Sequence, residues 1–245
     1  MFVATCDCRS GLGPSVRRGH WRAVTAMRGP GFADILAAFN RVPEIGGAYF
    51  RVVERGFQPV DLHPEAQKPL MGIGGVIAPG SALAQIEANL PERVAVLLKK
   101  RSREDASREK QVEAAAVRAA LNDSLRLVGF GDELRLIASQ WRIELGGRGE
   151  LVDLLAVDIV NGDLVVIELK PEEDRRAIPQ ASRYAEQLRR HGEEATRFFA
   201  SLADAMGRVY RCADLVDVSL SGRVRAIAAW PTATFSVPYE VVRCL

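Results

Sequence analysis

The sequence has few of the residues that build structural metal sites or disulfide frameworks. It contains only four cysteines and three histidines in 245 residues. Cys6 and Cys8 lack a second ligand pair at the spacing of a zinc finger. We therefore expect no structural zinc site, and we interpret the cysteines as reduced thiols of a cytoplasmic protein.

Long apolar runs and a strong net charge are also missing. No run of about 18 apolar residues is present, so we expect no membrane-spanning helix and no membrane partner. The first 26 residues lack the apolar segment of a secretory signal. The net charge is only +2, so a nucleic-acid site would have to come from local clusters of lysine and arginine.

The first part of the chain predicts a small β-rich domain. Phe32, Ile35, Leu36 and Phe39 recur at helical spacing and predict a helix over residues 31–42. Two strands are expected within 47–62 and another over 92–98. The predicted division of the chain is a disordered extension at 1–26, the β-rich domain at 27–98, a charged linker at 99–111 and an α/β domain at 112–245.

The remainder of the chain alternates helices and strands. The predicted elements are a helix over 112–127, a strand over 134–145, a hairpin, a helix from Gln180 after Pro179 that runs to Gly207 in one or two pieces, and strands over 208–220, 223–230 and 235–245. This order predicts an α/β fold with a mixed sheet flanked by helices.

The hairpin over residues 150–170 has polar residues in apolar surroundings. Asn161 and Gly162 are typical of a two-residue type I′ turn. With that turn, Asp153 lies opposite Lys170, and Glu168 projects from the same face of the sheet. Buried acids are costly unless they bind a partner, so the hairpin predicts a site for a divalent cation.

A reactive site can be assembled around these residues. Asp153 and Glu168 would hold Mg²⁺ or Mn²⁺, with the main-chain carbonyl of Leu169 as a further ligand. Lys170 would orient water or neutralise charge on a phosphate. Gln180 and Tyr184 are four residues apart, so they share one helix face beside the site.

Basic residues near the site are candidates for contacts with phosphate groups. They are Lys99, Lys100 and Arg101 in the charged linker, Arg148 in the glycine-rich turn and Arg183 on the helix of Gln180. A solvated, mixed-charge linker and a solvated turn arginine are the alternative interpretations.

The spacing of these residues resembles the PD-(D/E)xK nuclease superfamily. Asp153 is followed, after fourteen residues, by Glu168-Leu169-Lys170, and then by Gln180-x-x-x-Tyr184 as in its RecB-type branch. Residues 113–245 look like the nuclease domain of NucS endonucleases. The resemblance implies a restriction-endonuclease-like fold and a Mg²⁺- or Mn²⁺-dependent DNA endonuclease with Lys170 as catalytic lysine.

The same resemblance implies further roles. Glu113 matches the helix glutamate that assists the metal ligands, and Glu109 is a weaker match. NucS enzymes cut branched or mismatched DNA, which implies DNA repair, and dimerisation through the N-terminal unit is expected by resemblance alone.

The chain departs from the family at both ends. NucS enzymes bind a sliding clamp through a C-terminal tail, but residues 239–245 look like a final strand, so the resemblance does not support clamp binding. The N-terminal half also differs. Two alternatives stay open: a module that binds nucleic acid without cutting it, and a restriction-type defence nuclease. For the site itself, the alternative is a salt-bridged strand pair.

Overall fold

The computed structural model describes residues 18–29, 32–41, 48–53, 56–62, 68–69, 92, 95, 107–131, 133–145, 148–233 and 236–244. In chain order, the elements are α1 (Arg18–Arg28), α2 (Phe32–Asn40), β1 (Ala48–Val53), β2 (Gly56–Asp61), β3 (Lys68–Pro69), α4 (Arg108–Asn122), β4 (Leu134–Leu145), β5 (Arg148–Asp158), β6 (Asp163–Leu169), α5 (Ala177–Arg189), α6 (Gly192–Tyr210), a 3-10 turn η1 (Ala213–Leu215), β7 (Val224–Ala233) and β8 (Ser236–Cys244).

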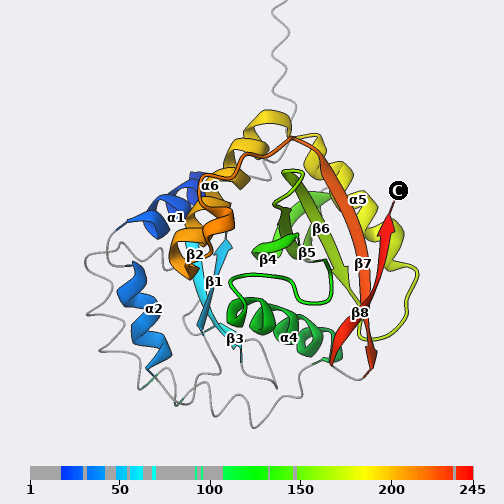
Figure 1. Cartoon of the computed structure of the whole chain (residues 1–245), viewed down its shortest axis with the longest axis horizontal. Coiled ribbons are helices and arrows are strands. Elements are labelled where there is room, and N and C mark those ends of the chain that lie inside the picture. Colours follow the sequence, from blue (N-terminus) through cyan, green and yellow to red (C-terminus); the bar gives the residue numbers. More distant parts are fainter. Residues whose placement is uncertain are drawn as a thin grey trace, which may run out of the picture.

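The larger sheet has five strands in the order β4-β5-β6-β7-β8 (Figure 1). Neighbouring strands are antiparallel except β6 and β7, which are parallel and are connected through α5 and α6. A parallel pair needs such a long crossover, which helices usually provide. The predicted α/β fold with a mixed sheet flanked by helices is confirmed.

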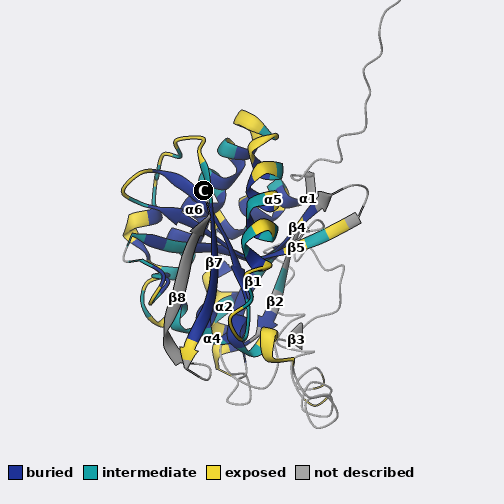
Figure 2. Cartoon of the chain, turned by 90° about the vertical axis from the view of Figure 1, so that its right-hand side faces the viewer, coloured by how far each residue is buried: buried dark blue, intermediate teal, exposed yellow. Residues whose placement is uncertain are grey.

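The two faces of this sheet are covered by different helices. Ala177 of α5 packs with Ala228 and Trp230 of β7. On β4, Trp141 packs against Phe198 in a tilted arrangement and against Phe199 edge to face, both on α6. Every residue of β6 is buried, and Figure 2 shows that burial extends along the neighbouring strands. Polar side chains on these strands therefore lie in a largely apolar layer.

The smaller sheet, β1-β2-β3, is antiparallel. Helix α2 and strands β1 and β2 confirm the helix predicted over 31–42 and the strands predicted within 47–62. Their buried side chains share one hydrophobic core with those of α4, α6 and β4–β7. Arg118 of α4 also donates a hydrogen bond to the carbonyl of Leu62 over 3.1 Å. Strand β1 is thus packed directly beside the larger sheet.

Several predicted elements in the first half differ from the structure. Residues 18–28 form a helix that overlaps the end of the stretch 1–26, which was predicted to be a disordered extension. Of the strand predicted over 92–98, only Glu92 and Ala95 are described, and both are helical. Helix α4 begins earlier than predicted because the Ser107 hydroxyl accepts a hydrogen bond from the Lys110 N–H. The boundaries predicted between domains stay a prediction.

The strand predicted over 208–220 is wrong. Helix α6 continues through Tyr210, and Arg211 closes it with a positive φ of 57°. The Tyr210 hydroxyl accepts a hydrogen bond from the Phe50 N–H of β1, so a tertiary contact holds the last helical turn. Helix α5 starts at Ala177 instead of Gln180, and the helical stretch predicted in one or two pieces consists of two helices, α5 and α6.

The predicted two-residue turn at Asn161-Gly162 is also wrong. Asp158 pairs with Asp163, so four residues form the loop. The Asp158 carboxylate accepts hydrogen bonds from the N–H groups of Val160 and Asn161, which stabilises this longer loop. The predicted pairing of Asp153 with Lys170 is therefore shifted by two positions, which leaves the face of every side chain unchanged.

None of the described helices is both long enough and apolar enough to cross a membrane.

Candidate functional site

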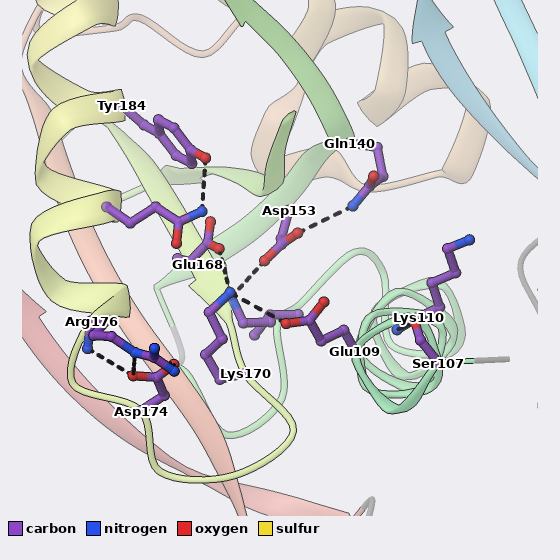
Figure 3. Close-up of polar contacts among 12 residues, drawn as sticks. Ser107, Glu109, Lys110, Gln140, Asp153, Glu168, Lys170, Asp174, Arg176 and Tyr184 are labelled. Atoms are coloured by element: carbon purple, nitrogen blue, oxygen red, sulfur yellow. Dashed lines mark hydrogen bonds and ion pairs between the residues drawn. The ribbon is translucent and has the colours of Figure 1, made fainter. Parts of the chain in front are cut away.

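The candidate site lies where the end of β6 runs beside β5, on the face of the sheet that α4 and α5 border. The observed register, extended by one pair, places Asp153 opposite Glu168. Figure 3 shows the side chains of Asp153, Glu168, Lys170 and Glu109 converging on one region. The three residues predicted from the hairpin are therefore brought together by the fold.

Asp153 is held by a hydrogen bond at each carboxylate oxygen. Oδ2 accepts from the Leu169 N–H over 2.8 Å, and Oδ1 accepts from Nε2 of Gln140 over 3.2 Å. Each carboxylate oxygen can accept two such interactions. The carboxyl group is therefore fixed in orientation and retains lone pairs for another ligand.

Glu168 is almost completely buried, with 3% of its side chain exposed. Its Oε1 accepts a hydrogen bond from the ammonium group of Lys170 over 3.0 Å. Its Oε2 has no hydrogen-bond partner among the described residues. A buried carboxylate oxygen without a partner is rare and commonly marks a place for a water or an ion.

Lys170 links the strand carboxylates to helix α4. Besides Glu168, its ammonium group contacts Oε1 of Glu109 over 3.5 Å. Glu109 is well exposed, whereas 16% of the Lys170 side chain is exposed. One cation thus faces acids from two elements, and the pKa of Lys170 is raised above its ordinary value because these acids outweigh its burial.

The two strand carboxylates are electrostatically strained. Burial, and next the negative charge of Asp153, raise the pKa of Glu168 to about 8. Burial also raises the pKa of Asp153 to about 6, although the hydrogen bond from Leu169 and the charge of Lys170 lower it. A further positive charge between these carboxyl groups would be strongly favoured because it would stabilise both ionised forms.

The two glutamates predicted from α4 lie in different positions. Glu113 is buried, and its Oε2 accepts a hydrogen bond from Gln140 Nε2 over 2.8 Å. Its Oε1 is 3.6 Å from the guanidinium group of Arg51 on β1. Glu113 is thus connected to Asp153 by hydrogen bonds through the side-chain amide of Gln140, whereas Glu109 contacts Lys170 directly.

Gln180 and Tyr184 are paired on α5, as their spacing predicted. Gln180 Nε2 donates a hydrogen bond to the Tyr184 hydroxyl over 2.8 Å. Tyr184 is buried, and burial raises the pKa of its hydroxyl. Glu150 and Glu168 raise the same pKa further, so the hydroxyl stays protonated. Figure 3 shows Tyr184 at the margin of the site.

The donors present fit a hard divalent cation. No group of three or more His, Cys, Asp or Glu side chains that could hold a metal ion occurs among the described residues. Mg²⁺, however, is often bound by one or two carboxylates, with water and substrate phosphate as the other ligands. Asp153 and Glu168 supply that pair, and the buried Oε2 of Glu168 is available to a ligand. The backbone of Leu169 adjoins both.

The predicted phosphate-binding residues are only partly described. Lys99, Lys100 and Arg101 lie outside the described residues, as does the side chain of Arg148, whose backbone begins β5. Arg183 is exposed on α5, next to Tyr184 in the chain. Their contact with nucleic acid stays a prediction.

Two residues that the structure brings to the site were not predicted from the sequence. Gln140 bonds to both Glu113 and Asp153, and Arg51 reaches Glu113 from the smaller sheet. A glutamine between Ser139 and Trp141 in a buried strand was a usable signal for Gln140. No local pattern marks Arg51, because its role depends on packing between distant segments.

Comparison of the chain with protein-family models, with curated proteins and with solved structures gives no match.

Proposed function

We propose that the protein is a DNA endonuclease that requires Mg²⁺ or Mn²⁺ and has a restriction-endonuclease-like nuclease domain of the NucS type. The resemblance in sequence suggests the substrate, and the chemistry of the site supports the reaction class. Branched or mismatched DNA, cut during repair, is the substrate class that this resemblance favours.

One observation carries the proposal. Two buried carboxyl groups, Asp153 and Glu168, converge beside Lys170, and one buried oxygen of Glu168 has no partner among the described residues. A plain salt bridge would need only one of these acids. Two buried acids repel each other, and a divalent cation bound between them would offset this repulsion and also attract a phosphate group.

Each side chain of the site would have a separate role in phosphodiester hydrolysis. Asp153 and Glu168 would hold the cation, which when bound makes water more acidic and offsets charge on the phosphate. Lys170 would donate a hydrogen bond to a phosphate oxygen as negative charge develops there. Gln180 and Tyr184 supply neutral donors at the margin of the site.

A cleavage assay tests the proposal. Purified protein should be incubated with branched, single-stranded and mismatched DNA in the presence of Mn²⁺ or of EDTA. We expect cleavage of at least one substrate with Mn²⁺ and none with EDTA. The isosteric variants Asp153→Asn and Glu168→Gln should lose cleavage while DNA binding is retained.

The control variant is Glu186→Gln, because Glu186 is half exposed on α5 and pairs with Arg190 instead of the site. It should cut like the wild type. Binding of DNA without cleavage of any substrate, in the presence of metal, would contradict the proposal and favour a module that binds nucleic acid without cutting it.

A further inference from the structure

Gln140 has a backbone conformation that glutamine rarely adopts. Its φ is +50°, within strand β4. The ladder with β5 continues on either side, where Ser139 pairs with Leu154 and Trp141 pairs with Val152, and its register shifts once, between Leu136 and Ala138. The positive φ therefore falls inside the paired stretch, opposite Asp153. Glycine or asparagine would tolerate this conformation more easily than glutamine.

The side chain of Gln140 explains why glutamine is present. Its amide nitrogen donates to Oε2 of Glu113 over 2.8 Å and to Oδ1 of Asp153 over 3.2 Å. An amide NH₂ group has two hydrogens, one for each acceptor. Figure 3 shows this amide directed at the Asp153 carboxyl group.

The Gln140 amide holds the carboxyl groups of two acids, which come from different elements, in a fixed relative orientation. Without a donor between them, Glu113 of α4 and Asp153 of β5 would face each other as like charges. Because the Leu169 N–H fixes the other oxygen of Asp153, the carboxyl group can turn neither toward Glu113 nor away from Glu168. Strained residues that persist at a functional site are commonly part of its preorganisation.

We infer that Gln140 is a positioning residue, which ties Asp153 to Glu113 and so holds Asp153 in the orientation needed to bind the divalent cation. This inference rests on the proposed function. It explains why a glutamine occupies a strained position in β4: a long amide side chain is needed there to reach both Glu113 and Asp153. A shorter amide in the same conformation would bridge neither acid.

The test compares Gln140→Asn and Gln140→Gly with the wild type. Both replacements accept a positive φ, so the backbone needs no rearrangement, and thermal melting by circular dichroism should show a cooperative fold. Mn²⁺ binding is then measured by calorimetry. We expect the dissociation constant to rise about 10- to 100-fold in both variants, the usual cost of removing a residue that orients metal ligands.

A second readout separates positioning from a general loss of structure. The Mn²⁺ concentration for half-maximal DNA cleavage should rise by the same factor, and saturating Mn²⁺ should restore the wild-type rate. Gln187→Asn is the matched control, since it makes the same chemical change on α5, outside the strand and the helix that the Gln140 amide connects. It should leave Mn²⁺ affinity unchanged.

The outcomes distinguish the inference from the proposed function. Wild-type Mn²⁺ affinity in both folded Gln140 variants would overturn the inference alone. Lost cleavage that saturating Mn²⁺ does not restore would also overturn it. A wild-type protein that binds no Mn²⁺ and cuts no DNA would overturn the proposed function, and the inference that rests on it.

Discussion

Replacing Glu168 with glutamine should flatten the pH dependence of stability of the metal-free protein. Burial, and next the charge of Asp153, raise the pKa of Glu168 in the folded state to about 8. In the unfolded chain the group returns to its ordinary pKa. The folded state therefore binds more protons between these two values, and its free energy of unfolding falls as the pH rises.

The size of the effect follows from the pKa shift. Within the window from the ordinary pKa of 4.5 to about 8, each pH unit lowers the free energy of unfolding by about 1.4 kcal/mol. Between pH 5 and pH 7, Glu168 alone should therefore remove up to about 3 kcal/mol of stability. The loss ends above the folded pKa, where the carboxyl group is ionised in both states.

The assay is urea unfolding in EDTA at a series of pH values. The difference in free energy between wild type and Glu168→Gln should change steadily from pH 5 to pH 8, because only the wild type has the titrating group. The exposed residue Glu186 provides the control, and Glu186→Gln should follow the wild-type curve. Parallel curves for wild type and Glu168→Gln would refute the assigned electrostatic strain.

Three further predictions concern the hairpin and the proposed cation site. Asp158→Ala should lower the free energy of unfolding by about 2–3 kcal/mol in urea titrations, because it removes the acceptor of two loop N–H groups and the partner of Arg225; unchanged stability would contradict this. Gly162→Ala should cost about 1–3 kcal/mol, since φ is +68° and a Cβ would lie 2.6 Å from the Ser219 carbonyl oxygen; an unchanged melting temperature would be inconsistent with this packing. Mn²⁺ at about a hundredfold excess over its dissociation constant should stabilise the wild type by about 2.7 kcal/mol in thermal melts, and an equal gain in Asp153→Asn would argue against Asp153 as a ligand.

The hairpin shows what a sequence can predict about a site. The common face of Asp153, Glu168 and Lys170 was predicted, because alternation along strands depends only on whether positions are odd or even. The exact register was wrong, because the Asp158 side chain stabilises a four-residue loop. An error of two residues preserved the face, whereas an error of one would have lost the site.

Roles that depend on tertiary packing do not follow from the alternation of side chains along a strand. A glutamine in a buried strand marks Gln140, but no local propensity favours its positive φ, and no local pattern marks Arg51, which reaches Glu113 from a different sheet. The last turn of α6 is likewise held by the contact between Tyr210 and Phe50. These arrangements arise from the shared core of the two sheets, which joins segments far apart in the chain.

The most direct measurement of the central claim compares the wild type with Lys170→Met on branched DNA in Mn²⁺. Methionine matches the apolar stem of lysine as far as Cε but lacks the ammonium group that contacts Glu168 and Glu109. The account predicts cleavage by the wild type and binding without cleavage by Lys170→Met. Equal cleavage rates for the two proteins would contradict it.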